Sequence, residues 1–187
     1  AWGTRHQDAE AVRMVLATCD RMAAGGIYDQ LGGGFARYAT DAAWAIPHFE
    51  KMLYDNAQLV QLYLDAYLVS GAPRHAAVVR ETLRYVLRDM TDADGGFYAA
   101  EDADSEGREG RYYCWTLAEV AGLLTPEELR VAARYFGISA EGDFVDHSDP
   151  DPLPGQNVLR VAAAAPGPGE AEVLAAARAK LLAARGG

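Results

Sequence analysis

One short stretch of the chain gathers polar side chains of several chemical kinds. His48, Glu50, Lys51, Tyr54 and Asp55 fall within about two turns of an expected helix. His48 and Glu50 are candidates to move a proton or bind a sugar hydroxyl, because an imidazole titrates near neutral pH. Alternatively, both residues only satisfy the start of the helix, where free N–H groups attract anions.

Three neighbours of this pair have a chemical and a structural interpretation. Lys51 and Asp55 are four residues apart, so we expect a helical ion pair, although either side chain is also a candidate to bind substrate. Tyr54 either presents its hydroxyl to a pocket or is a buried tyrosine with one hydrogen bond.

An acidic segment farther along the chain is the second candidate for chemistry. Its carboxylates surround Gly107 and are Glu101, Asp102, Asp104, Glu106 and Glu109. Crowded carboxylates raise one another's pKa, and glycoside hydrolysis requires a carboxylate pair, so Asp102 and Asp104 are catalytic candidates. Alternatively, the segment is a hairpin whose Asp side chains only cap strands. A calcium loop is disfavoured because the twelfth position holds Tyr113, and we expect no metal.

Aromatic residues surround both candidates. Rings next to carboxylates and to Arg37 suit carbohydrate, because sugar C–H faces stack on rings while hydroxyls need polar partners. Alternatively, these rings fill the core. They are Phe35, Tyr38, Trp44, Phe97, Tyr112 and Trp115.

Composition excludes several classes of partner. The 187 residues carry 17 Lys plus Arg against 27 Asp plus Glu, a net charge of −10, which repels nucleic acid. No apolar run approaches the ~20 residues that span a bilayer, and no signal-peptide pattern opens the chain. Cys19 and Cys114 show no metal-type spacing. We therefore expect no nucleic-acid or membrane partner and a cytoplasmic location.

Periodicity and punctuation predict the elements that position these residues. Helices are expected at about residues 6–24, 47–70, 74–90, from 116 as a short helix, 125–136 and 170–185. Short hairpins are expected from strands 35–38 with 44–46 and 97–100 with 111–115, and residues 137–168 are expected to be mostly loop.

A short Gly-Gly-Phe repeat follows two of these helices. Gly33-Gly34-Phe35 recurs as Gly95-Gly96-Phe97, and helix pairs punctuated in this way are typical of a ring of α-hairpins. In such a ring, the helix at 47–70 is an inner helix buried on most sides, and the helix at 74–90 is an outer, amphipathic one. We therefore predict an all-α fold with small β-hairpins.

Three motifs in order resemble one known family. They are residues 25–38 (GGIYDQLGGGFARY), 47–56 (PHFEKMLYDN) and 102–107 (DADSEG) with 110–116 (GRYYCWT). The chain resembles the thioredoxin-domain-containing family that includes the spermatogenesis-associated thioredoxin-like proteins, over roughly residues 8–185. The resemblance implies a partial (α/α) toroid similar to six-hairpin glycosidases and N-acylglucosamine 2-epimerases. It also implies that residues 1–187 are an internal segment, without the family's N-terminal thioredoxin-like domain.

Two functions remain open from this comparison. The first is a carbohydrate-binding or carbohydrate-active domain, glycosidase-like or epimerase-like, with no cofactor and with the remainder of the full-length protein as a partner. Its catalytic candidates are His48, Glu50, Asp102 and Asp104, and its substrate-binding candidates are Arg37, Tyr38, Trp44, Lys51, Tyr54, Asp55 and Trp115. The second is a non-catalytic scaffold or ligand-binding module that supports the thioredoxin-like domain, because a fold does not settle a function.

Overall fold

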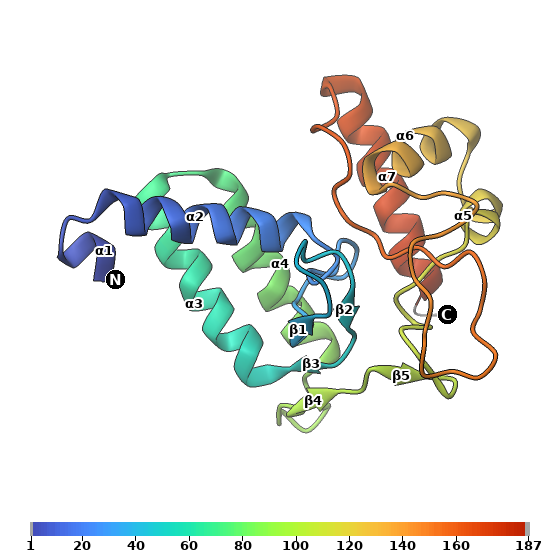
Figure 1. Ribbon diagram of the computed structural model, residues 1–187, viewed down its shortest axis with the longest axis horizontal. Helices are drawn as coiled ribbons and strands as arrows, with labels where there is room; N and C mark the ends of the chain where they lie inside the picture. The colour runs from blue at the N-terminus through green and yellow to red at the C-terminus, as the bar shows by residue number, and fades with distance from the viewer. Residues whose placement is uncertain (1, 186–187) are drawn as a thin grey trace.

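The structure is a computed structural model that describes residues 2–185. Its helices are α1 (Trp2–Arg5), α2 (Ala9–Ala24), α3 (Leu53–Ser70), α4 (Pro73–Asp89), α5 (Leu117–Leu123), α6 (Pro126–Phe136) and α7 (Pro168–Arg185). Its strands are β1 (Tyr38–Ala39), β2 (Pro47–His48), β3 (Lys51–Met52), β4 (Ala100–Glu101), β5 (Asp104–Ser105) and β6 (Arg108–Glu109). Helices α1–α4 form one group and α5–α7 a second, with loops and short strands between them (Figure 1).

Most predicted helices form close to their expected bounds, because the capping residues at their ends form the expected hydrogen bonds or turns. The side chain of Asp8 accepts a hydrogen bond from the backbone at the start of α2. Thr116 and Thr125 each form a complete capping box, at α5 and α6 respectively. Gly71 ends α3 in the left-handed conformation. A mostly helical architecture with short antiparallel strand pairs is therefore confirmed.

The predicted start of the second long helix is wrong. Helix α3 begins at Leu53 rather than Pro47, because residues 46–52 run extended between two neighbouring segments. The N–H of Arg37 donates to the carbonyl of Glu50 at 2.8 Å, and the N–H of Leu53 donates to the carbonyl of Ala99 at 2.9 Å. His48, Glu50 and Lys51 thus lie on this extended ribbon, whereas Tyr54 and Asp55 lie in the first turn of α3.

The hairpins differ from the predicted ones in register. Strand β1 pairs with β2, so the first hairpin forms, but its second strand begins at Pro47. The predicted pairing of 97–100 with 111–115 does not occur, because β4 pairs with β3 and β5 pairs with β6. Glu106 and Gly107 both have positive φ, which makes a two-residue turn that matches the strand twist and closes β5 onto β6.

Each helix group has its own core. In the first group, Phe35 and Tyr63 are fully buried and their rings stack at 5.3 Å. In the second, the core is formed by α5, α6 and α7, and Leu31 from the loop after α2 inserts into it. The N–H of Val161 also donates to the carbonyl of Ala24 at 2.8 Å, so the two groups are joined by main chain as well as side chains.

Helix α3 is less enclosed than predicted. It packs against α2 and α4, but large apolar side chains on its remaining face are exposed. Those exposed residues of α3 are Tyr54, Leu64, Tyr67, Leu68 and Val69. The prediction that this helix is buried on most sides is therefore wrong for the described residues.

The turn before β1 provides a stability test. Gly34 has a φ of 81°, and a Cβ there would overlap the ring of Tyr85. Gly95 has a φ of 91° but nothing within 4 Å of an added Cβ. We predict that Gly95→Ala costs about 1–2 kcal/mol of unfolding free energy from backbone strain alone, and that Gly34→Ala costs about 1–3 kcal/mol more from overpacking. Urea unfolding of both variants measures the difference, and equal losses would contradict the close approach.

Candidate functional site

The extended ribbon sorts its side chains onto two faces. Successive residues of an extended chain point to opposite sides. Pro47, Phe49 and Lys51 are buried, whereas His48 and Glu50 on the alternate positions are partly exposed. The segment therefore supplies an outer face with His48 and Glu50, and an inner face with Lys51.

On the outer face, His48 meets a residue from the acidic segment. The Nδ1 atom of His48 lies 2.7 Å from Oε1 of Glu109, and the same oxygen accepts the N–H of Phe49 at 3.3 Å. The ring of Tyr38 stacks on the imidazole, with centroids 5.0 Å apart. The side chains of His48 and Glu109 are 29% and 26% exposed, so this pair is reachable from solvent.

Glu50 lies in a second polar group on the same face. Nη1 of Arg37 is 3.2 Å from Oε2 of Glu50, and the guanidinium lies 6.0 Å from the centre of the Tyr54 ring. Tyr38 and Tyr54 are each about half exposed. The outer face therefore carries two accessible rings beside two carboxylates, an imidazole and a guanidinium, a composition that suits a polyhydroxylated ligand.

A hollow of about 410 Å³ adjoins Glu109. It lies between the loop that joins β1 to β2 and the loop at 143–148, and its lining includes Thr40, Phe144 and His147. Its size falls within the range of small-molecule pockets, roughly 300–1,000 Å³. Glu109 thus connects the outer face to a space that a ligand can enter.

Asp102 and Asp104 lie beside this arrangement. The carboxylate of Asp102 accepts the N–H of Asp104 at 3.1 Å and caps a turn, and both residues are exposed. Asp104 lies directly opposite Glu109 in the β5–β6 pair. Among residues 2–185, no hydrogen bond or ion pair joins either aspartate to His48 or Glu50. Glu109, rather than Asp102 or Asp104, therefore makes the contact with His48.

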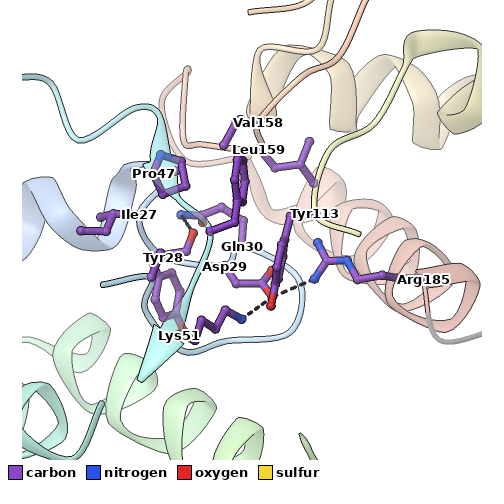
Figure 2. Close-up of a pocket in the computed structure, with 13 residues that line it drawn as sticks. Ile27, Tyr28, Asp29, Gln30, Pro47, Lys51, Tyr113, Val158, Leu159 and Arg185 are labelled. Atoms are coloured by element: carbon purple, nitrogen blue, oxygen red, sulfur yellow. Dashed lines mark hydrogen bonds and ion pairs between the residues drawn. The ribbon is translucent and has the colours of Figure 1, made fainter. Parts of the chain in front are cut away.

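On the inner face, Lys51 belongs to a buried ionic network (Figure 2). Its Nζ atom lies 3.1 Å from Oδ2 of Asp29 and 3.1 Å from the carbonyl of Gly33. The same Oδ2 atom accepts Nη1 of Arg185 at 2.7 Å. All three charged side chains are at most 5% exposed.

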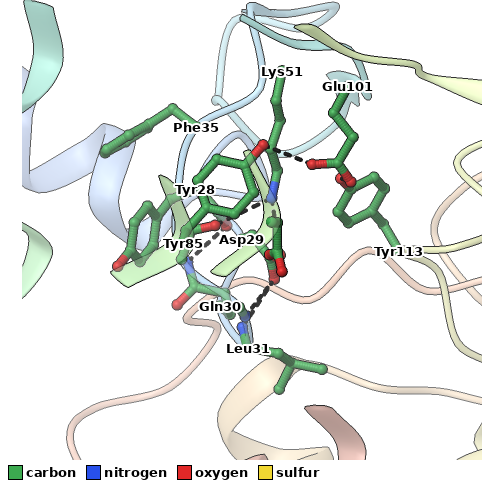
Figure 3. A network of polar contacts seen from close by, with 12 residues as sticks. Tyr28, Asp29, Gln30, Leu31, Phe35, Lys51, Tyr85, Glu101 and Tyr113 are labelled. Carbon is green, nitrogen blue, oxygen red and sulfur yellow. Dashed lines mark hydrogen bonds and ion pairs between the residues drawn. The ribbon is translucent and has the colours of Figure 1, made fainter. Parts of the chain in front are cut away.

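Two tyrosines enclose the ammonium of Lys51 (Figure 3). Its Nζ lies 4.2 Å from the ring centre of Tyr85 and 4.7 Å from that of Tyr113, within cation–π range. The hydroxyls of both tyrosines donate to Glu101, at 2.6 Å and 2.5 Å respectively. The network thus balances the cations Lys51 and Arg185 with the carboxylates of Asp29 and Glu101.

The predicted ion pair between Lys51 and Asp55 does not form. Lys51 lies in β3 rather than on a helix, and its ammonium is directed to Asp29 instead. Asp55 lies in the first turn of α3, and its Oδ2 atom is buried without a hydrogen-bond partner.

Electrostatics shows how tightly the inner network is held. Burial raises the pKa of Asp29, but Arg185, Lys51 and two backbone N–H donors outweigh it, so its pKa lies far below its usual value. Burial, and then the charge of Glu101, raise the pKa of Tyr113 and of Tyr85. The adjoining cavity measures about 20 Å³, which is room for about one water. The inner network is therefore built to hold the fold together.

The two tryptophan candidates lie mostly in cores. Trp44 packs against the core of the first helix group, and Trp115 is 7% exposed in the core of the second. Phe35 is also fully buried. For these rings, the structure agrees with the interpretation that they fill the interior.

Two further findings concern metal binding and membrane spans. Within residues 2–185, no group of three or more His, Cys, Asp or Glu side chains is placed to hold a metal ion. No helix in that part of the chain has the length and apolar character to cross a membrane.

Some participants were not singled out from the sequence. Asp29 was missed, although it lies between the glycines at 25–26 and 32–34, where a chain folds tightly on itself. Tyr85 and Arg185 fall within predicted helices, and no local pattern links them to Asp29. Glu109 is one of several carboxylates in the acidic segment. Its position in the pairing of β5 with β6 distinguishes it from the others.

Comparison with known proteins identifies relatives of this chain. No protein-family model matches the chain. Spermatogenesis-associated protein 20 is 44% identical over 170 residues in Mus musculus and 42% identical over 169 residues in Homo sapiens, in each case 82% of this chain. The chain is homologous to part of spermatogenesis-associated protein 20. An uncharacterized protein of Caenorhabditis elegans is 36% identical over 167 residues, or 81% of the chain.

The relatives are much longer than the aligned region. The match covers 21% of the Mus musculus protein, 22% of the Homo sapiens protein and 23% of the Caenorhabditis elegans protein. The chain therefore spans about a fifth of the length of the curated relatives that it matches.

Removing the shared carboxylate tests the inner network. We predict that Asp29→Ala lowers the free energy of unfolding by about 3–5 kcal/mol, because it leaves two buried cations without their partner. Asp94→Ala, at an exposed turn position, is the matched control and should change it by less than about 0.5 kcal/mol. Urea unfolding compares the two, and a small loss in Asp29→Ala would show that the network contributes little.

The same residue predicts a pH dependence. The folded-state pKa of Asp29 is depressed, so its stabilisation is fully present above the unfolded value of about 3.9 and is lost as pH falls towards the folded value. Below about pH 4, Asp29→Asn should lose stability less steeply than the wild type, by up to about 1.4 kcal/mol per pH unit. Urea unfolding at a series of acid pH values measures both slopes, and parallel curves would contradict the depressed pKa.

Proposed function

We propose that this chain is a segment of a thioredoxin-domain-containing protein and that its outer face binds a carbohydrate or a similar polar ligand. The similarity to spermatogenesis-associated protein 20 supports the family assignment. The helical pairs α3–α4 and α6–α7 support an (α/α) toroid of helical hairpins, of which residues 1–187 form an internal part.

The contact between His48 and Glu109 carries the proposal. It joins residues 61 positions apart, at the edge of a hollow and beside the exposed ring of Tyr38. A half-buried imidazole–carboxylate pair next to an aromatic surface is a common arrangement for binding a sugar and for moving a proton.

The pair has a defined chemical capacity. With the N–H of Nδ1 directed to Glu109, Nε2 of His48 is the nitrogen left to accept a proton from a ligand. Glu50, held by Arg37, supplies a carboxylate on the same face. Asp104 lies opposite Glu109, and Asp102 flanks it, so the face offers the carboxylates that a glycosidase-like or epimerase-like reaction uses.

A non-catalytic scaffold is the second candidate, and the inner network favours it. Lys51, Asp29 and Arg185 are buried and mutually paired, with space for about one water beside them. In that role, the segment supports the remainder of the full-length protein and binds a ligand without turnover. A cytoplasmic location belongs to both proposals and is supported by the two free, buried cysteines.

A glycan-binding and turnover screen on the complete protein tests these functions. We expect saturable binding to an oligosaccharide, with Kd raised at least about tenfold by Tyr38→Ala and by Glu109→Gln, which is about 1.4 kcal/mol. If turnover is found, His48→Asn should lower kcat by about 100-fold or more, the usual effect of losing a general base.

The control for this screen is Glu127→Gln, an exposed carboxylate in the first turn of α6 that should leave binding unchanged. Saturable binding without turnover favours the scaffold. No saturable binding across the panel, or equal binding by all three site variants and the wild type, contradicts a ligand-binding outer face.

A further inference from the structure

One face of the α3–α4 pair is open and apolar. The two helices pack against each other, and Tyr63 and Val78 join Cys19 of α2 in a core on their other face. On the open side, Leu68 is 71% exposed and Leu87 is 66% exposed. Clustered apolar side chains of this kind mark interaction sites. The exposed apolar residues of this open face are Leu64, Tyr67, Leu68, Leu83 and Leu87.

Helical spacing places these leucines on one side of the hairpin. The exposed leucines of each helix are four residues apart, so each pair lies on one side of its helix. That side is opposite Ala66 in α3 and Tyr85 in α4, which are both buried. Ala66 packs into the core with Phe35, and Tyr85 lies against the neighbouring Gly34. The buried sides therefore face the same interior, and the leucines of both helices face outward together.

Unpaired cations border the open face. Arg80 and Arg84 lie one turn apart on α4, beside its exposed leucines. Both are exposed, and neither forms an ion pair within residues 2–185. In contrast, Arg74 and Arg88 of the same helix pair with aspartates. The two free guanidinium groups make this edge complementary to a partner that carries carboxylates.

The amount of exposed surface favours a permanent occupant. The chain exposes 10191 Å², whereas a compact monomer of its mass, 20.1 kDa, exposes about 8,700 Å². The excess of roughly 1,500 Å² is larger than the ~800 Å² that each partner buries in an interface of standard size. Surface on this scale fits coverage by more of the same protein better than a transient partner.

We propose that a helix from the remainder of the full-length protein covers the open face, with carboxylates of that helix directed to Arg80 and Arg84. This inference rests on the proposal that residues 1–187 are an internal segment. The aligned region is 21% of the Mus musculus relative and 22% of the Homo sapiens one, so most of such a protein lies outside this chain. An amphipathic helix fits because its apolar stripe packs between two parallel rows of leucines.

Thiol labelling of the complete protein tests whether the open face is covered, with mass spectrometry to identify the labelled peptide. Leu87→Cys and Ala57→Cys each place a thiol on this face, since Ala57 is exposed and lies two turns before Leu64. We expect both thiols to react at least about 100-fold more slowly in the folded protein than in urea, because the docked helix must leave first. The native Cys19 is buried, so its slow labelling shows that each variant is folded. Ala57→Cys is the milder change and decides the question if Leu87→Cys fails to fold.

A charge reversal tests the basic edge. Arg84→Glu should speed the labelling of Ala57→Cys about fivefold, because repulsion replaces attraction at the rim of the contact. Arg21→Glu is the matched control, an exposed arginine of α2 on the other side of α3, and should leave the rate unchanged. Labelling as fast in the folded protein as in urea overturns the proposal, and equal rates in the two arginine variants overturn the acidic character of the occupant.

A photo-reactive side chain at Leu83 of the complete protein identifies the occupant. We expect a cross-link within the same polypeptide, to a helix outside these 187 residues that has Asp or Glu within one turn of the linked position. A cross-link to a second copy overturns the proposal. The glycan screen probes other residues, so a free open face would leave the ligand-binding outer face standing.

Discussion

The carboxylate of Asp29 is the contact on which the arrangement of the chain depends. One of its oxygens accepts hydrogen bonds from Lys51 of β3 and from Arg185 at the end of α7, and the other accepts a backbone N–H of the loop in which it lies. Burying a charge costs free energy of folding unless the charge is paired, so these three side chains stabilise the fold only together. The glycine-rich loop around Asp29 brings its one carboxylate to two cations that come from distant elements of the chain.

The extended ribbon at 46–52 links this anchor to the outer face. Because alternate residues point to opposite sides, fixing Lys51 inside also fixes the direction of Glu50 and His48 outside. A helix over the same residues would have spread these side chains around its circumference. The pairing of β1 with β2 and of β3 with β4 therefore decides which residues face solvent and which hold the interior.

The sequence predicted the helices well and the site geometry only in part. Local signals such as the capping boxes at Thr116 and Thr125 act within a few residues, so they can be read directly. Pro47 resembles the first residue of a helix as much as the first residue of an edge strand, and only pairing with distant segments resolves that choice. The contacts of Asp29 with Arg185 and of His48 with Glu109 span 156 and 61 residues, distances at which local patterns carry no information.

The position of Arg185 at the end of α7 has a consequence for how the chain is made. During synthesis, Asp29 and Lys51 leave the ribosome long before Arg185, so the carboxylate of Asp29 has only one of its two cationic partners until the end of α7 is made. The ion pair that links the two helix groups can form only when the final turn of α7 arrives, because that turn carries Arg185. We expect the joining of the two helix groups to be a slow step of folding, because this contact spans 156 residues.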